Sequence, residues 1–199
     1  MPLEPRDLDP DPIVQLSRWV ADAEAAGVSL PNAFALATAD GEGVPSVRFV
    51  LMHGLDAEGL RYYTNRGSRK GRDVAANPWG AAAFWWPALD RQARAAGPVR
   101  QLPDDASLAY WSTRPRGSRL SAAASSQGQE IGSREELEVR VAELAARHPD
   151  EVPIPGMWGG YLLIPRTVEF WESREDRLHD RVEYRRGADG SWHRRRLQP

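Results

Sequence analysis

The chain has 199 residues, no cysteine and a formal net charge of -2, and 41% of its residues are hydrophobic. This composition is typical of one globular domain with a substantial core, so we take residues 1–199 as a single domain. The absence of cysteine excludes disulfides, thiolate catalysis and cysteine-ligated metals, and it suits a cytoplasmic protein. The charge argues against nucleic acid as a partner, and the longest nearly apolar run, residues 79–89, is too short to cross a membrane.

The first eleven residues are acidic and rich in proline, which predicts a flexible start without the apolar core of a signal peptide. Apolar residues then recur at helical spacing from Ile13 to Ala23, and Gly27 is a typical helix stop. From residue 33 the sequence pattern becomes typical of β-strands, with a hairpin signal at Asp40-Gly-Glu-Gly43. Strands are predicted at residues 33–39, 44–53, 60–65, 79–86 and 91–102.

Helices interrupt this series of strands. One is predicted to begin in Gly67-Ser-Arg-Lys-Gly-Arg-Asp, a second covers residues 104–113 before Pro115, and Ser133 with Glu136 forms the capping box of a third. The chain then returns to predicted strands at residues 158–164, 167–171, 178–186 and 191–197. Successive strands with helical interruptions favour a mainly β fold with flanking helices, an antiparallel barrel rather than a parallel α/β sheet.

Several familiar chemistries have no motif in this sequence. It contains no P-loop, no dinucleotide-binding glycine fingerprint after a strand and no nucleophile elbow. The four histidines lack the spacing of metal ligands, so no metal site is expected. If the chain is an enzyme, a bound organic cofactor is expected to carry its chemistry.

Two arginine clusters suit the binding of a phosphorylated cofactor. Arg48 is a charge within an apolar strand, which is costly unless the charge is paired. After the strand that contains Tyr63, a predicted helix begins with Ser68, Arg69 and Lys70. Free backbone N–H groups at a helix start, together with a hydroxyl and two cations, form a cradle for phosphate.

Two further clusters suit a substrate. Residues 110–119 offer a phenol, hydroxyls and three guanidinium groups around an expected turn, which suits a second phosphate. Arg177, His179 and Arg181 are expected on one face of a strand, where they can address one ligand. Each cluster taken alone also fits a solvated surface. For residues 194–196 we assume such a surface or a structural pairing. Two phosphate cradles in a nearly neutral chain indicate a phosphorylated cofactor and a phosphorylated substrate.

In these residues the chain resembles the pyridoxamine 5'-phosphate oxidase family, from about Asp9 to Pro199. The matching segments are Arg48-Phe-Val-Leu51, Tyr63-Thr-Asn65, Ser68-Arg-Lys70, Arg91-Gln92, Ser112-Thr-Arg-Pro-Arg-Gly-Ser118, Trp158-Gly-Gly160, Glu169-Phe-Trp171, Arg177-Leu-His-Asp-Arg181 and Arg196-Leu-Gln-Pro199. The resemblance implies a split β-barrel, FMN as cofactor, and a homodimer with two FMN sites at the subunit interface.

The resemblance also implies a role for individual residues. The residues expected to hold FMN are Arg48, Phe49, Val50, Leu51, Tyr63, Thr64, Ser68, Arg69, Lys70, Gln92 and Gln127, with Trp171 and Arg181 from the other subunit. The residues expected at the substrate are His53, Tyr110, Arg114 and Ser118 around its phosphate, with Arg177 and His179 as catalytic residues over its pyridine ring. The implied reaction moves a hydride from C4' of pyridoxine or pyridoxamine 5'-phosphate to flavin N5, and O2 reoxidises the flavin to give hydrogen peroxide.

The chain departs from the family pattern near the substrate. His53 stands where the family usually has a lysine that helps to hold the substrate phosphate. Residues 121–123, Ser-Ala-Ala, replace the usual Gly-Ala-Trp. On the cofactor side, Gly128 replaces a serine that in the family follows Gln127 near FMN. The family's N-terminal Arg-x-x-Tyr segment is also expected to be missing.

These departures leave two alternatives beside an oxidase of pyridoxine and pyridoxamine phosphates. One is an FMN-dependent oxidase of a different reduced ring, similar to the oxidases of phenazine biosynthesis, which His53 and the missing tryptophan favour. The other is a flavin-binding split barrel without turnover, against which Arg177 and His179 argue. An oxidase of pyridoxine and pyridoxamine phosphates is favoured by the retained set of Tyr110, Arg114 and Ser118.

Overall fold

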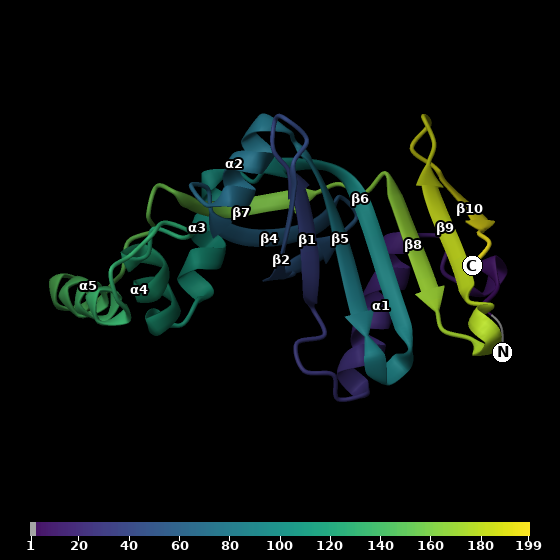
Figure 1. Cartoon of the computed structure of the whole chain (residues 1–199), viewed down its shortest axis with the longest axis horizontal. Coiled ribbons are helices and arrows are strands. Elements are labelled where there is room, and N and C mark those ends of the chain that lie inside the picture. The colour runs from purple at the N-terminus through teal and green to yellow at the C-terminus, as the bar shows by residue number, and fades with distance from the viewer. Residues whose placement is uncertain (1–2) are drawn as a thin grey trace.

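Within residues 3–199, which the computed structural model describes, ten antiparallel strands form one curled sheet (Figure 1). The strands are β1 (Ala33–Ala39), β2 (Pro45–Leu51), β3 (Gly54–Asp56), β4 (Gly59–Asn65), β5 (Trp79–Trp86), β6 (Arg91–Gln101), β7 (Trp158–Leu163), β8 (Thr167–Glu172), β9 (Asp180–Arg186) and β10 (Trp192–Arg196). The helices are α1 (Pro12–Ala25), α2 (Arg69–Ala76), α3 (Asp104–Thr113), α4 (Arg116–Ala124) and α5 (Arg134–Arg147), with 3-10 turns at Pro5–Asp7, Pro87–Leu89 and Glu175–Arg177. This architecture confirms the expected mainly β, antiparallel fold.

The sheet divides along β6. One edge of β6 pairs with β5, whereas on the other edge residues 91–96 pair with β8 and residues 99–101 pair with β7. One branch continues from β8 to β10, and the other continues from β7 to β4 and β3. Gly97 lies at the division, where an added Cβ atom would come within 2.0 Å of the carbonyl oxygen of Ile164. The close approach of the two chain segments therefore requires glycine at this point.

Helix α1 packs across the sheet and covers its core. The side chain of Asp11 caps the helix by accepting a hydrogen bond from the backbone N–H of Ile13 at 2.8 Å. The buried Trp19 meets the rings of Trp86 and Phe170 edge-on, with centroid distances of 6.3 and 4.9 Å. The helix thereby ties β5 to β8. No helix within residues 3–199 combines the length and the apolar character that crossing a membrane requires.

A smaller hydrophobic cluster supports the end of the molecule where α3, α4 and α5 lie (Figure 1). Its buried members are Trp111, Leu120, Val152 and Trp158, and Val141 and Leu144 of α5 pack against them. Ser133 caps α5 as predicted, since its hydroxyl accepts a hydrogen bond from the backbone N–H of Glu136 at 3.2 Å. This cluster holds α3 and α4 beside β4 and β7, where they form one side of the site.

Most predicted elements are present, and those at residues 33–39, 79–86 and 104–113 have the predicted bounds. Residues 116–124 form a helix where we expected a turn. Proline disfavours the helical conformation in the residue before it, so Arg114 is extended, with ψ of 143°, and α3 ends. The proline ring itself suits a helix start, and α4 begins directly after Pro115.

The predicted strand at residues 178–186 begins two residues later, at Asp180. Asp176 and Arg177 have positive φ angles of 55° and 61°, which is left-handed backbone and not extended strand. The expectation that strand alternation places Arg177, His179 and Arg181 on one face is therefore wrong, because the first two residues precede β9.

The N-terminal segment, which we expected to be flexible, makes defined contacts with β9 and β10 over its described residues, 3–11. The backbone N–H of Leu3 donates to Asp180 at 2.9 Å, and Arg194 donates to the carbonyl oxygens of Pro5 and Leu8 at 2.8 Å each. Leu8 is buried in the main core. These contacts anchor the segment; residues 1 and 2 lie outside the described part of the chain.

The division of the sheet yields a first prediction. Gly97→Ala is expected to destabilise the protein by about 1–3 kcal/mol, because the new methyl group overpacks the contact with Ile164. Gly117→Ala is the matched control, since a Cβ atom there meets nothing within 4 Å. Urea unfolding of both variants measures the effect, and equal stability of the two would contradict the proposed role of Gly97.

Candidate functional site

A cavity of about 720 Å³ lies between β2, β4, the start of α2 and the α3–α4 turn. The predicted cofactor residues on its lining are Arg48, Phe49, Val50, Leu51, Tyr63, Thr64, Ser68, Arg69, Lys70 and Gln127, and the predicted substrate residues there are His53, Tyr110, Arg114 and Ser118. Segments that are far apart in the sequence thus converge on one cavity. Gly128 and Thr113 also line it.

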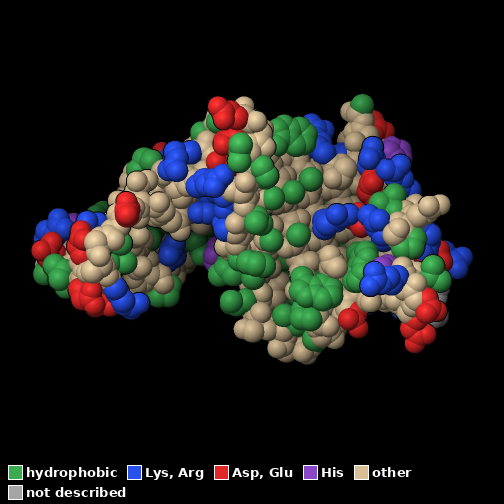
Figure 2. All heavy atoms as spheres, viewed as in Figure 1, with side chains coloured by type: hydrophobic (Ala, Val, Ile, Leu, Met, Phe, Trp, Pro, Cys, Tyr) green, Lys and Arg blue, Asp and Glu red, His purple; other side chains and the backbone are tan. Residues whose placement is uncertain are grey.

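Three cations, Arg48, Arg69 and Lys70, form what we call the cationic wall of this cavity. Arg48 extends from β2, and the other two begin α2, which follows directly after β4. The start of α2 packs so closely on the turn after β4 that a Cβ atom on Gly71 would lie 2.1 Å from the carbonyl oxygen of Arg66. Figure 2 shows basic side chains gathered between the helical end of the molecule and the apolar face of the sheet.

Lys70 is the most deeply buried member of the cationic wall, with 8% of its surface exposed. Its ammonium group donates to the hydroxyls of Thr64 and Ser68 at 3.2 and 3.1 Å, and to Oε1 of Gln127 at 3.0 Å. Burial and the neighbouring charge of Arg48 lower the pKa of Lys70 to about 8. An ammonium group with these neutral partners gains from the approach of an anion.

The other side of the cavity is a stack of aromatic rings. The ring of Tyr63 stacks on Tyr110 with a centroid distance of 4.0 Å and on Trp158 at 5.5 Å. The guanidinium carbon of Arg114 lies 4.9 Å above the Trp158 ring, which is a cation–π contact. Arg114 thus stands rigidly beside the phenol of Tyr110, where both can address one anion.

His53 lies at the exposed rim of this side, and its Nδ1 is 2.9 Å from the hydroxyl oxygen of Tyr110. Partial desolvation in the cavity, with the nearby charge of Arg114, lowers the pKa of His53 below its usual value. The imidazole is therefore mostly neutral at pH 7. A neutral histidine at this position contributes a hydrogen bond to the rim rather than a fixed charge.

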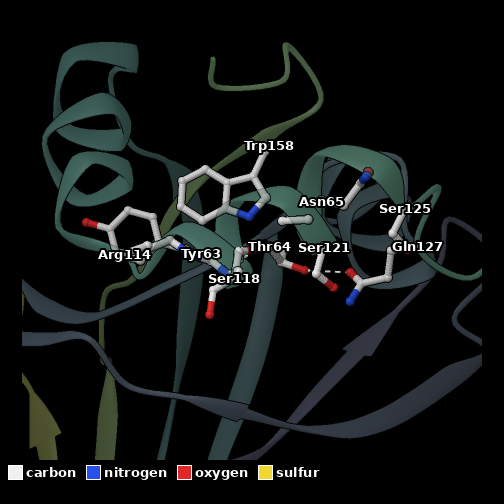
Figure 3. A pocket seen from close by; sticks show the side chains of 11 residues that line it. Tyr63, Thr64, Asn65, Arg114, Ser118, Ser121, Ser125, Gln127 and Trp158 are labelled. Carbon is white, nitrogen blue, oxygen red and sulfur yellow. Dashed lines mark hydrogen bonds between the residues drawn. The ribbon is translucent and has the colours of Figure 1, made fainter. Parts of the chain in front are cut away.

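A second cavity, of about 440 Å³, adjoins the first beside α4 (Figure 3). The two cavities share five lining residues, which are Tyr63, Thr64, Arg114, Ser118 and Gln127. Figure 3 shows Ser121 of α4 and Ser125, the residue after α4, facing this space, with the Trp158 ring across from them. We did not predict these three residues. A prediction of α4 as a helix would have identified Ser121, which lies on the same helix face as Ser118, three residues earlier.

A second group of predicted residues lies away from both cavities, on β6, β8 and β9. Gln92, Trp171 and Arg181 line a separate cavity of about 200 Å³ and are neighbours across these strands. In Figure 1 this branch and the α3–α5 helices lie at opposite ends of the molecule. The structure therefore places Gln92 beside Trp171 and Arg181, away from the predicted cofactor residues that line the 720 Å³ cavity.

The two predicted catalytic residues lie beside this second group, in the segment just before β9. His179 is half-buried, with its ring 4.6 Å from that of Trp171, and its Nδ1 accepts a hydrogen bond from the backbone N–H of Arg174 at 3.2 Å. Arg177 is exposed in the 3-10 turn before β9. Within residues 3–199, no three histidine or acidic side chains gather in a way that could hold a metal ion.

Comparison with known proteins identifies relatives over the whole chain. Residues 20–148 match a family model described as pyridoxamine 5'-phosphate oxidase, and residues 158–199 match one described as the pyridoxine 5'-phosphate oxidase C-terminal dimerisation region. The chain is 48% identical to the pyridoxine/pyridoxamine 5'-phosphate oxidase of Cupriavidus pinatubonensis, covering 99% of this chain and 93% of the relative. It is 50% identical to the enzyme of that name from Anaeromyxobacter dehalogenans, covering 100% of both chains.

Solved structures give the same picture of the fold. A crystal structure of PhzG from Burkholderia lata in complex with tetrahydrophenazine-1-carboxylic acid matches with a TM-score of 0.93 and 34% identity, over 99% of this chain and 98% of that one. An FMN-binding protein from Nostoc punctiforme, related to pyridoxamine 5'-phosphate oxidase, matches with a TM-score of 0.77 and 21% identity over 100% of both chains. The expected split-barrel fold is confirmed.

The lowered pKa of Lys70 predicts how the cavity responds to pH. Lys70 is charged below its pKa of about 8 and loses the charge as the pH rises through that value. The affinity of the cofactor-free protein for FMN is therefore expected to fall above pH 8, by up to about tenfold per pH unit. The phosphate group of FMN ionises near pH 6, so it stays dianionic over the range that matters.

Fluorescence titrations with FMN between pH 7 and 9 measure this effect. Lys70→Arg is expected to remove the fall in affinity, because arginine keeps its charge throughout. Riboflavin, which lacks the phosphate, is the control ligand and is expected to bind with little change over the same range. An FMN affinity that is constant from pH 7 to 9 in the parent protein would contradict the prediction.

Proposed function

Because the chain belongs to the pyridoxamine 5'-phosphate oxidase family, we propose that it is an FMN-dependent oxidase of pyridoxine and pyridoxamine 5'-phosphates. The proposed product is pyridoxal 5'-phosphate, with O2 reduced to hydrogen peroxide. The observation that carries the proposal is the cavity of about 720 Å³ that joins a cationic wall to a pocket of phenol, guanidinium and hydroxyl groups. Such a cavity suits a phosphorylated cofactor beside a phosphorylated substrate. The cysteine-free composition suits the cytoplasmic setting that we also propose.

The donor groups of the cavity fit FMN. Its phosphate matches the cationic wall, where a buried ammonium group has neutral oxygen partners. The residues proposed to hold FMN from this subunit are Arg48, Phe49, Val50, Leu51, Tyr63, Thr64, Ser68, Arg69, Lys70 and Gln127. When bound, FMN supplies the acceptor for the hydride that leaves the substrate and passes the electrons to O2.

The substrate phosphate is proposed to bind on the aromatic side of the cavity. Arg114 offers a fixed guanidinium, Tyr110 a phenol and Ser118 a hydroxyl, and all three line the cavity. The cation–π contact with Trp158 limits the freedom of Arg114, which lowers the entropic cost of binding. His53 completes the set at the rim through its hydrogen bond with Tyr110. These groups bind and orient the substrate and leave the redox chemistry to the cofactor.

We propose a homodimer in which the second group of residues completes the partner's cavity. Gln92, Trp171 and Arg181 would approach the cofactor there, with Arg177 and His179 over the substrate ring. Two observations support this: residues 158–199 match a dimerisation region, and the sheet exposes a broad apolar face (Figure 2). Large exposed apolar side chains on this face of β2 and β5 are Val47, Phe49 and Trp85. Exposed patches of this kind mark interaction surfaces.

A second candidate, an oxidase of a different reduced ring, is favoured by one observation. The adjoining 440 Å³ cavity enlarges the space beside the aromatic stack, and Ser121 and Ala122, in the segment that departs from the family pattern, line it. The structure of PhzG, with which the chain shares its fold and 34% of its residues, holds a tetrahydrophenazine carboxylic acid. The names of the closely similar curated relatives favour the first candidate.

One experiment distinguishes these functions. The purified protein is mixed anaerobically with pyridoxine or pyridoxamine 5'-phosphate, and the flavin absorbance is followed. We expect the flavin to bleach and to recover with release of hydrogen peroxide when air is admitted. Bleaching by a reduced phenazine carboxylic acid alone would support the second candidate. Stable colour with either substrate would indicate a flavin-binding protein without turnover.

Loss of Arg177 is expected to slow the reduction of the flavin by substrate by about 100-fold, because a cation near the ring stabilises the charge that develops there. FMN is expected to remain bound in Arg177→Ala. Arg147→Ala at the end of α5 is the control for loss of a positively charged arginine, and stopped-flow absorbance measures the rate. Parent-like reduction by Arg177→Ala would remove this residue from the catalytic set.

The neutral state of His53 predicts an unusual pH dependence of substrate binding. The pKa of His53 is lowered, so the residue gains charge only below its usual range, and phosphate binding should tighten as the pH falls below about 6.5. In His53→Lys the charge is permanent and this dependence should disappear. The substrate phosphate itself ionises near pH 6 and acts in the opposite direction, so the variant is compared with the parent across pH 5.5–8. Identical profiles of KM for the two proteins would show that His53 does not meet the phosphate.

A further inference from the structure

We propose that Asp73 is a positioning residue for cofactor binding, which acts with Thr38 and Ser46 to fix the guanidinium of Arg48 in the cationic wall. The family resemblance assigns no role to these three residues. The inference rests on the proposed binding of FMN and identifies what makes the cavity select a phosphorylated flavin.

Asp73 lies on the inward face of α2, one turn after Arg69, and only 4% of its surface is exposed. Its Oδ2 accepts hydrogen bonds from the hydroxyls of Thr38 and Ser46, both at 2.6 Å. These hydroxyls come from β1 and β2, where the two residues face each other in register. The carboxylate therefore joins helix α2 to the first hairpin of the sheet.

Arg48 completes this network from the same face of β2 as Ser46, two residues further along the strand. Its Nη1 donates to the Thr38 hydroxyl at 2.7 Å and to the carbonyl oxygen of Leu36 at 3.2 Å, and its Nη2 donates to the Ser46 hydroxyl. Nη2 is 3.7 Å from Oδ2 of Asp73. Each hydroxyl thus gives its proton to the carboxylate and accepts one from the guanidinium, so the directions of these four hydrogen bonds are consistent.

The carboxylate stays ionised in this position. Burial alone would raise the pKa of Asp73, but the hydroxyl hydrogen bonds and the charges of Arg48 and Arg69 outweigh it, so the pKa lies below its usual value. Arg48 lines the cavity, whereas Asp73 does not reach the lining. The negative charge therefore sits behind the cationic wall, and of this network only Arg48 reaches the space that the phosphate would enter.

This arrangement explains a charge within an apolar strand. A free arginine side chain has many rotamers, and holding one in place before the ligand arrives removes that entropic cost from binding. A purely structural role for the network predicts something different. If it only stabilises the fold, its loss should weaken the binding of any flavin equally, with or without a phosphate.

The test compares FMN with riboflavin, which is the same flavin without the phosphate. Cofactor-free parent protein and the variants Thr38→Val, Ser46→Ala and Asp73→Asn are titrated with both ligands. We expect the ratio of FMN affinity to riboflavin affinity to fall about tenfold or more in each variant, as loss of one well-placed charged hydrogen bond implies. Riboflavin affinity itself is expected to stay within about twofold of the parent.

Asp73→Asn gives the sharpest result, because the loss of negative charge alone would raise the ratio of FMN affinity to riboflavin affinity, whereas the loss of positioning lowers it. Removing a carboxylate near the cationic wall should strengthen the attraction for phosphate, so a fall in the ratio reports the loss of positioning. Ser107→Ala is the control for loss of a buried hydroxyl: Ser107 donates to the carbonyl oxygen of Pro103 and accepts from the N–H of Gly160, away from the network. It is expected to leave the ratio unchanged.

Ratios within twofold of the parent in the network variants, or a raised ratio in Asp73→Asn, would overturn the inference. If one variant fails to fold, the remaining two decide. A parent protein that binds FMN well and shows unchanged ratios in the variants defeats this inference while the proposed function stands. A parent protein that binds FMN no better than riboflavin defeats both.

Discussion

Three cations gathered on one cavity wall are the constraint on which the rest of the site depends. Arg48 and Lys70 lose hydration when β2 and α2 pack together, and burial with the charge of Arg48 lowers the pKa of Lys70. Asp73 offsets part of this cost from behind the wall. The remaining positive charge faces the cavity, so an anion bound there would offset the repulsion among the three cations. A terminal phosphate is the ligand that meets this demand most directly.

The shape of the sheet decides which residues can act together within one chain. Because β6 changes partner along its length, β4 and β7 carry the cavity at one side while β8 and β9 extend to the other (Figure 1). Trp171 and Arg181 are thereby held away from the cationic wall of their own subunit. Bidentate hydrogen bonds from Arg181 to Glu169, at 2.9 and 3.2 Å, keep its side chain in a defined direction. Such a fixed group suits the proposed homodimer interface, which would also bury the apolar face of the sheet.

Membership of the family establishes the fold, whereas the substrate depends on a few side chains around the aromatic stack. Tyr110 and Arg114 are placed to meet an anion, which agrees with a phosphorylated substrate. His53 has no permanent charge, unlike the lysine that the family usually has at this position. Ser121 lines a cavity that leaves room beside the aromatic stack. We expect these differences to change the affinity for the substrate and the pH dependence of its binding.

The sequence by itself determined most of the elements and indicated the chemical type of the candidate site. Alternating residues and turn signals located β1 and β5 to the residue, and the order of basic and hydroxyl residues indicated both phosphate cradles. It did not reveal α4, because Pro115 ends one helix and starts the next, or the left-handed backbone at Arg177, which interrupts the strand alternation. The tertiary structure alone decided that Thr38, Ser46 and Asp73 support Arg48, and that Gln92 lies with Trp171. Local periodicity reports on neighbours along the chain, whereas these contacts join segments that meet only when the sheet curls and α2 packs against it.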